Sequence, residues 1–257
     1  MLVHLLGPFE VIREGSNVTP SAPKLRQVLA LLAVHANRVV RTDQLIEELW
    51  EDRPPLSATT TLQTYVYQLR KLFSWRVGEE PGVTLRTSPG GYMLGLPADA
   101  LDSQRFEHLA EQGQLALAAG DHAKASEILG EAQRLWRGRA LTAVDAGPVL
   151  HVQAVRLEEL HKVVVEQRLD ADLRLGRHLG LIGELRTLVS QQPTHEGFQA
   201  KLMLALYRSG RRSEALAVFQ HSRAILNDEL GLEPSMDLQR LHRAILAASP
   251  AIDVSAE

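Results

Sequence analysis

The chain has 257 residues, 45% of them hydrophobic and 23% charged, which is enough for one large domain or two ordinary ones. It contains no cysteine, which excludes disulfides and thiolate metal sites. No segment approaches ~18 consecutive apolar residues, so we expect no membrane span. The lack of cysteine is compatible with a reducing cytosol, and we expect a cytoplasmic, nucleoid-associated protein. The formal net charge of -3 argues mildly against nucleic acid as a partner, because nucleic-acid-binding domains are often strongly basic.

The local distribution of charge is more informative than the net charge. Residues 43–52 carry five acids, namely Asp43, Glu47, Glu48, Glu51 and Asp52. Residues 53–78 carry no acid and four cations, namely Arg53, Arg70, Lys71 and Arg76. A surface that faces phosphate needs only a local positive patch, because exposed charges are screened over about 8–10 Å. The second stretch is therefore compatible with DNA despite the acidic total.

The first 22 residues predict short strands, and three helical segments follow. Residues 2–6 and 9–13 are typical of short strands, with a turn at 14–17. Pro23 is suited to open a helix, since its missing N–H costs nothing there. Thr42 is suited to cap a second helix, and Pro54-Pro55 to end it.

A third helix and a hairpin complete this region. Ser57 or Thr59 can cap a helix that runs to about Ser74. Residues 83–86 and 92–94 predict paired strands across a turn at 88–91. Three helices followed by a two-stranded wing are the plan of a winged helix-turn-helix, and the leading strands fit its OmpR-type variant. We therefore assign residues 1–96 to an OmpR-type winged-helix DNA-binding domain.

Residues 101–248 predict an all-helical repeat domain, joined to the first region by a short Pro-containing segment that implies packed domains. Gly120, Gly176 and Gly210 each precede small or apolar residues at +5, +9 and +12. The last two glycines are separated by the 34-residue period of a tetratricopeptide helix pair, whereas the longer first interval requires an insertion. Glu233-Pro234 opens a final helix, in which Leu238, Leu241, Ile245 and Leu246 are expected to cap the array. The expected fold is thus mainly α with a small β component: a winged helix followed by a tetratricopeptide-like domain.

The third helix carries the strongest functional pattern. Leu62, Val66, Leu69 and Phe73 share one face at helical spacing, which predicts the buried side. The opposite side presents hydroxyl, amide and amine groups, with one arginine at its edge: Thr60, Gln63, Thr64, Tyr67, Gln68, Lys71 and Arg70. Hydroxyls and lysine can contact phosphates, and glutamine can form paired hydrogen bonds with adenine. An ordinary solvated face remains the alternative interpretation.

The hairpin adds one further candidate contact. Arg86 on the wing is placed to enter a minor groove or to meet phosphate, although it could equally be a surface residue. Arg41 and Arg53 are weaker candidates for backbone contacts.

The sequence gives little sign of catalysis, metal binding or cofactor binding. No histidine pair has metal-ligand spacing with a matching carboxylate, and no phosphate-binding loop, dinucleotide fingerprint or nucleophile elbow is present. We therefore expect a protein that is not an enzyme and carries no metal and no cofactor.

Motifs in order along nearly the whole chain resemble the Streptomyces antibiotic regulatory proteins. In the first half they are His35-Ala36-Asn37-Arg38-Val39-Val40, Leu49-Trp50, residues 61–71 and Gly90-Gly91-Tyr92-Met93-Leu94. In the second half they are Leu135-Trp136-Arg137-Gly138, residues 156–160, 171–178 and 202–211, Asp228 to Pro234, and residues 241–246. Each motif alone is weak, but the ordered set is specific.

The resemblance implies a winged helix followed by a bacterial transcriptional activation domain. Members typically activate antibiotic or other secondary-metabolite gene clusters by binding direct repeats near the promoter -35 element. They commonly bind as two side-by-side copies and recruit RNA polymerase holoenzyme with its sigma factor. The implied DNA contacts here are Thr60, Thr64, Tyr67, Gln68, Arg70, Lys71 and Arg86. An arginine often precedes the Thr-Leu-Gln segment in the family, where this chain has Thr59-Thr60. We expect no regulation by nucleotide, because the 257 residues include none of the ATPase or sensor extensions of larger relatives.

Two other functions remain open at this point, as does a small-molecule effector in the groove of the repeats, for which the sequence singles out no ligand. A repressor of the same fold would block polymerase instead of recruiting it. A protein-interaction scaffold would use its repeats and its winged helix to bind proteins only.

Overall fold

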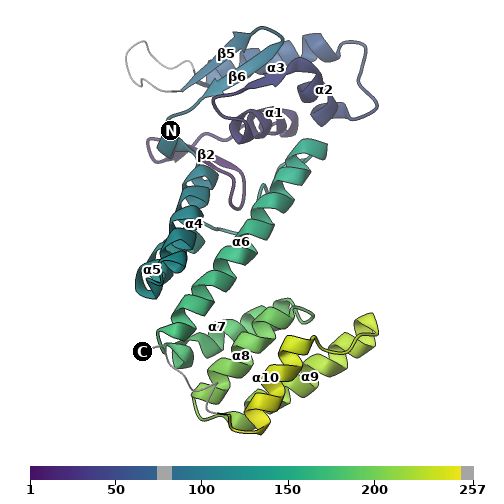
Figure 1. The fold of residues 1–257 in the computed structure, drawn as a ribbon. Coiled ribbons are helices and arrows are strands. Elements are labelled where there is room, and N and C mark those ends of the chain that lie inside the picture. The colour runs from purple at the N-terminus through teal and green to yellow at the C-terminus, as the bar shows by residue number, and fades with distance from the viewer. Residues whose placement is uncertain (74–82, 250–257) are drawn as a thin grey trace. The chain divides into compact units, whose positions relative to one another are not determined.

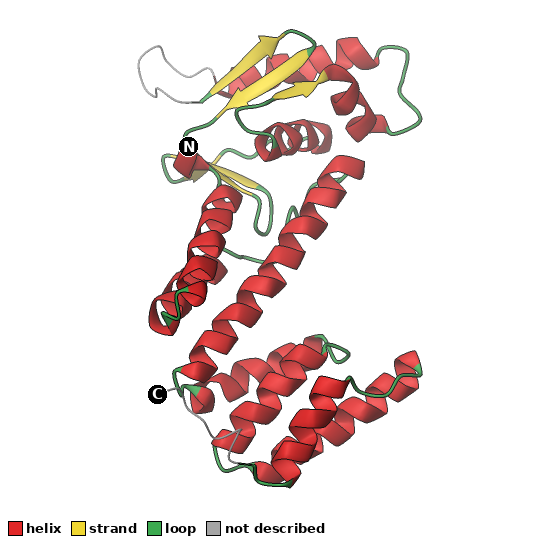
Figure 2. Cartoon of the chain, viewed as in Figure 1, coloured by secondary structure: helices red, strands yellow, loops and turns green. Residues whose placement is uncertain are grey.

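The computed structural model describes residues 1–73 and 83–249, which form mostly helices and two small antiparallel sheets (Figures 1 and 2). The chain divides into two compact units. The first contains residues 1–109 together with residues 131–162. The second contains residues 110–130 and the chain from residue 163 onward.

The first sheet consists of β1 (Leu2–His4), β2 (Glu10–Arg13) and β3 (Ser16–Asn17) in sequence order. Val3 lies opposite Val11, and both side chains are fully buried. The first two strands confirm the predicted strand regions, although both are shorter than predicted. Of the residues predicted as a turn at 14–17, only the first two form one, because Ser16 and Asn17 pair with β2.

Three helices and a short strand follow: α1 (Pro23–Val34), β4 (Val39–Arg41), α2 (Thr42–Trp50) and α3 (Ala58–Phe73). Pro23 opens α1 as predicted. The capping role predicted for Thr42 is wrong, since Arg41 occupies the N-cap position. The Thr42 hydroxyl instead donates to the Gly90 carbonyl at 3.2 Å and so ties the start of α2 to the wing turn.

The second sheet is the wing, in the order β4-β6-β5. Its hairpin strands are β5 (Thr84–Ser88) and β6 (Gly91–Gly95), which confirm the predicted hairpin. β4 pairs with β6 and places Val40 opposite Tyr92. At Gly91 an added Cβ would lie 2.0 Å from the Val40 carbonyl oxygen, so only glycine allows the two strands this approach.

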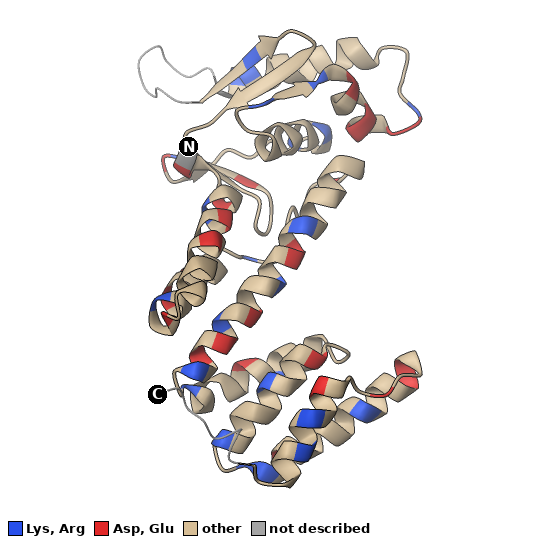
Figure 3. Cartoon of the chain, in the orientation of Figure 1, with Lys and Arg blue, Asp and Glu red and all other residues tan. Residues whose placement is uncertain are grey.

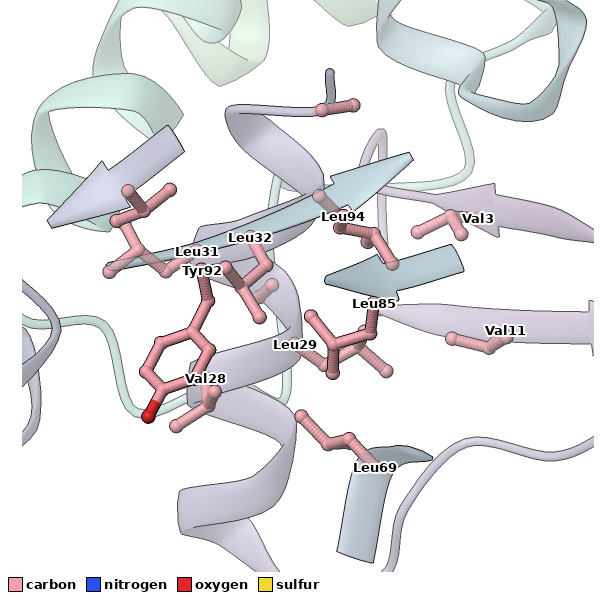
Figure 4. Close-up of a cluster of buried hydrophobic side chains, with 14 of the residues drawn as sticks. Val3, Val11, Val28, Leu29, Leu31, Leu32, Leu69, Leu85, Tyr92 and Leu94 are labelled. Atoms are coloured by element: carbon pink, nitrogen blue, oxygen red, sulfur yellow. The ribbon is translucent and has the colours of Figure 1, made fainter. Parts of the chain in front are cut away.

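One hydrophobic core joins both sheets to the helices of the first unit (Figure 4). The middle of α1 contributes an almost continuous buried run, from Val28 to Ala33. Leu85 and Leu94 reach this core from the wing, and Leu69 reaches it from α3. Burying a side chain of this size contributes roughly 1.5–3 kcal/mol. The wing and α3 therefore rest on a shared support.

The second half of the chain is helical, as predicted. After a 3-10 turn (Ala98–Ala100), its helices are α4 (Asp102–Ala118), α5 (His122–Arg134), α6 (Pro148–Arg174), α7 (His178–Gln191), α8 (Glu196–Arg208), α9 (Arg212–Leu230) and α10 (Met236–Leu246). Gly120, Gly176 and Gly210 lie in the turns α4–α5, α6–α7 and α8–α9, with φ of +77°, +75° and +75°. The shared left-handed conformation explains the recurrence of glycine.

The residues predicted to line the repeat seams are largely buried. At +5 and +9 from the three glycines, all six side chains are at most 6% exposed: Ala125, Leu129, Leu181, Leu185, Ala215 and Phe219. The helices of the second unit share a second hydrophobic core, and α10 packs on it through Leu238 and Ile245. Leu246, also predicted to face the array, is half exposed, whereas its neighbour Ile245 is fully buried.

Residues 131–162 join the core of the first unit instead of the repeats. The Arg137 N–H donates to the Leu6 carbonyl at 2.8 Å, and the Leu141 N–H donates to the Leu5 carbonyl at 2.8 Å. Leu141 and Leu150 are part of the same core as α1 and the wing. The division into residues 1–96 and 101–248, and the packing of these two domains, stay predictions.

An aromatic cluster lies in this part of the first unit. The rings of Trp136 and His161 stack with centroids 4.1 Å apart, and Phe106 meets Trp136 edge-on at 5.4 Å. Burial lowers the pKa of His161 to about 4, because the charged imidazolium loses its hydration. This histidine is therefore neutral at physiological pH.

Candidate nucleic-acid interface

α3 presents an apolar side to the core and a polar side to solvent. Leu62, Val66 and Leu69 are at most 1% exposed, which confirms the predicted buried stripe. The side chain of Phe73 and the whole of Ser74 and Arg76 lie outside the described part of the chain. The stripe fixes the rotation of the helix about its axis, so the opposite side must face outward.

The polar side of α3 is exposed along its length. The exposed residues are Thr60, Gln63, Thr64, Tyr67, Gln68 and Lys71. Tyr67 is 67% exposed, which is unusual for an aromatic side chain and leaves its hydroxyl accessible. The Thr64 hydroxyl donates to the Thr60 carbonyl at 3.0 Å, so a phosphate contact through this group would require it to rotate.

Arg70 holds the wing against α3. Its Nε donates to the Leu85 carbonyl at 3.0 Å, and Nη2 donates to the Thr87 hydroxyl at 2.7 Å. These two bonds commit one edge of the guanidinium to β5. Arg70 is therefore a positioning residue for the wing, a role that its helical position alone did not indicate.

Arg86 lies on the outer side of the wing. Its neighbour Leu85 is buried and Arg86 is exposed, as the alternation of a strand requires. Arg70 bonds to the Leu85 carbonyl and to the Thr87 side-chain hydroxyl, so it holds the two residues that flank Arg86. α3 and the wing thus present their polar groups from one rigid support.

Charge differs sharply between the second and third helices (Figure 3). Exposed acids lie on α2 and just after it: Asp43, Glu47, Glu51 and Asp52. α3 has no acid in its first turn and two cations, Arg70 and Lys71, in its last. The polar side of α3 is therefore free of the carboxylates that would repel phosphate.

The weaker candidates Arg41 and Arg53 are both exposed. Arg41 forms an ion pair with Asp43, and its hydrogen bond lowers the pKa of that carboxyl. The pair partly neutralises Arg41, which weakens it as a phosphate contact.

A buried carboxylate on α2 was missed from sequence. Glu48 is 1% exposed and accepts backbone N–H bonds from Gly147, Val149 and Leu150 at 2.7, 2.8 and 3.4 Å. These groups begin α6, where the helix dipole favours a negative charge. Burial nevertheless raises the pKa of Glu48, against the lowering effect of the N–H bonds. Among the acids at 43–52, only its place on the inner face of α2 distinguished it.

Asp102 is a second buried anchor in the same unit. Its carboxylate accepts the backbone N–H groups of Leu5 and Leu6 at 2.7 and 3.2 Å. Gln27 joins α1 to α2 by donating to the Glu48 carbonyl at 2.6 Å. The bonds of Gln27 and Glu48 join α1, α2 and the start of α6 to one another.

In the described ranges, no group of histidine, aspartate or glutamate side chains is arranged to hold a metal ion. Likewise, none of the helices there combines the length and hydropathy that crossing a bilayer requires.

Comparison with known proteins identifies two family regions. Residues 16–94 match the family of the C-terminal domain of transcriptional regulatory proteins, and residues 101–246 match the bacterial transcriptional activator domain. The regulatory protein DnrI of Streptomyces peucetius is 45% identical over 98% of this chain and 94% of DnrI. The chain belongs to the Streptomyces antibiotic regulatory protein family.

Other relatives of the chain are also named as transcription regulators. RedD of Streptomyces coelicolor is 36% identical over 98% of this chain and 72% of RedD. A solved structure of Mycobacterium tuberculosis EmbR matches with a TM-score of 0.89 and 34% identity, over 98% of this chain and 68% of EmbR. The family identity and this match confirm the predicted fold class, a winged helix followed by a helical domain.

Proposed function

We propose that this family member is a sequence-specific DNA-binding transcription activator of an antibiotic or other secondary-metabolite gene cluster. The observation that carries the proposal is the exposed polar side of α3, which is free of acids and is flanked by Arg86 on the wing. The membership in a family of transcription regulators supports it.

In the proposed complex α3 lies in the major groove and the wing contacts the flanking strand. Gln68 and Tyr67 are placed near the middle of the exposed side, where base edges would be within reach. Thr60, Thr64 and Lys71 would contact phosphates, and Arg86 would contact the flanking backbone or minor groove. Arg70 would act mainly through the wing that it holds.

Activation in this proposal requires a second contact, with RNA polymerase. Two copies would bind side by side on direct repeats near the -35 element, and the activation domain would bind the holoenzyme including sigma factor. Two weak contacts, one to DNA and one to polymerase, become strong together because each raises the effective concentration of the other partner.

Fluorescence anisotropy with promoter duplexes tests the DNA contact. The probe is a duplex that carries paired direct repeats from upstream of the neighbouring biosynthetic genes, and the control duplex has the repeats scrambled. Lys71→Gln should make the negative slope of log K against log salt concentration shallower by about 0.9 if Lys71 neutralises one phosphate. Lys124→Gln, at an exposed lysine on α5, should leave the slope unchanged. Equal affinity for both duplexes in the unmodified protein would contradict the proposal.

Transcription with purified holoenzyme separates the alternatives. An activator increases transcript from a template with the repeats, whereas a repressor of the same fold decreases it. A scaffold that binds only proteins would show no salt-dependent affinity for either duplex.

A further inference from the structure

A cavity of about 540 Å³ lies within the first unit, beside the turn that connects α1 to β4. Residues 34–38 form one wall, and the facing sides of α4 and α6 form the others. Small-molecule sites typically occupy about 300–1,000 Å³, so the cavity has the size of a ligand site. It lies apart from the polar side of α3, and none of the proposed DNA contacts lines it.

The charged groups that line this cavity favour an anion. Arg38 and Arg156 contribute two positive charges, and Glu107 contributes one negative charge. Glu107 accepts a hydrogen bond from Nη2 of Arg156 at 2.5 Å, so its charge is already compensated. Arg38 forms no ion pair with any residue of the described ranges. The lining therefore retains one uncompensated positive charge.

Neutral groups in the lining add specificity and an apolar contact. The Gln153 amide accepts a hydrogen bond from Nε of Arg156 at 3.0 Å, which fixes the direction of that guanidinium. These two bonds use Nε and Nη2, so Nη1 keeps donors for a ligand. Gln104 offers a further amide, while Leu5 and Leu157 provide an apolar surface. A few placed polar groups beside apolar side chains are typical of small-molecule sites.

We propose that this cavity binds a small molecule bearing a carboxylate or phosphate group, whose anion lies between Arg38 and Arg156. Such a guanidinium pair suits these planar or tetrahedral anions, because each guanidinium can donate two parallel hydrogen bonds. The site goes beyond the proposed function, since binding there requires neither DNA nor polymerase.

Binding at the cavity would be communicated to the wing through Asn37. The Asn37 N–H donates to the Leu94 carbonyl at 2.8 Å, and its side chain exchanges two hydrogen bonds of 3.0 Å with the backbone of Leu96. Asn37 adopts φ of +65°, so the turn is set in one conformation by these bonds. A ligand held by the adjacent Arg38 would stabilise this turn and the end of β6 with it.

Isothermal titration calorimetry on the full chain tests the site at constant ionic strength. The probes are inorganic phosphate, succinate and benzoate, with choline chloride as the cationic comparison. We expect saturable binding of at least one anion and none of choline. Arg38→Gln and Arg156→Gln should each weaken binding about tenfold, as the loss of a charge-assisted hydrogen bond predicts. Arg139→Gln is the matched control, because Arg139 is 86% exposed and lies in the same unit outside the cavity.

Hydrogen exchange provides a second readout that requires no DNA. Saturation with the bound anion should slow exchange of the Leu96 N–H, which donates to Asn37. The proposal is overturned if no anion binds saturably, or if Arg38→Gln leaves anion binding unchanged. It is also overturned if Arg38→Gln weakens only the binding of duplex DNA, because Arg38 would then be a contact to DNA phosphate. Unchanged exchange at Leu96 would overturn the coupling to the wing.

Discussion

Two regions of the first unit use polar side chains in opposite ways. At the start of α6, the carboxylate of Glu48 is buried and accepts three backbone N–H groups. On α3, the side chains of Gln68 and Tyr67 are exposed and face solvent. Polar groups of the first kind stabilise the fold and would be costly to lose. Groups of the second kind add little to stability, which leaves them available to a partner.

The largest effect that this comparison predicts is at Glu48. Glu48→Ala removes the acceptor of three buried N–H groups and should lower the free energy of unfolding by about 3–5 kcal/mol. Urea unfolding followed by circular dichroism measures the loss. Glu47→Ala, at an exposed glutamate one residue earlier, should change stability by less than about 0.5 kcal/mol. Similar losses in both variants would remove the distinction between the two regions.

A second prediction concerns His161, a buried imidazole whose Nε2 has no hydrogen-bond partner in the described residues. Its pKa is lowered from 6.5 to about 4, so the folded state binds fewer protons than the unfolded chain between these values. Its stabilising contribution is present above pH 6.5 and is lost as the pH falls toward 4. Relative to His161→Phe, the protein should lose roughly 2–3 kcal/mol over this interval. Parallel acid titrations of the two proteins measure the difference, and coincident curves would contradict the burial of this ring.

The third prediction separates positioning from contact on the interface. Arg70→Ala should weaken promoter binding about tenfold and also speed hydrogen exchange in β5, because Leu85 and Thr87 lose their partner. Arg86→Ala should weaken binding to a similar extent without changing exchange in β5. Anisotropy and exchange on both variants provide the comparison. Unaltered exchange in Arg70→Ala would show that the wing does not depend on this residue.

A fourth effect, similar in size to the third, is expected in the repeat turns. Gly210 has φ of +75° and no neighbouring atom within 4 Å of an added Cβ, so Gly210→Ala introduces only backbone strain. The expected loss is about 1–2 kcal/mol. Gly180→Ala is the control, because an added Cβ there also meets open space and no left-handed φ is required. A helical glycine replaced by alanine should be neutral or stabilising.

Sequence patterns predicted the elements whose causes are local. The spacing of Leu62, Val66 and Leu69 predicted which side of α3 is buried, and the turn residues predicted the hairpin. The repeated glycines predicted three helix–helix turns, because each requires the same left-handed backbone conformation. In each case the deciding residues lie within a few positions of one another.

Long-range contacts could not be predicted in this way. β4 has only three residues and is recognisable as a strand only through its pairing with β6, about fifty positions later. The bonds from Arg70 to β5 and from Glu48 to residues 147–150 likewise join distant segments. Glu48 lies in an acidic run that is otherwise exposed, so neither its composition nor its charge distinguished it.

The membership of residues 131–162 in the first unit has a practical consequence for anyone who expresses part of the gene. A fragment that stopped at residue 96 would lack Leu141 and Leu150 from its core, along with the acceptor for the Phe9 N–H. Leu5 and Leu6, now fully covered, would be left as an open hydrophobic edge. Fragments of this length should aggregate or require a solubilising fusion, whereas one that continues to residue 162 keeps these contacts.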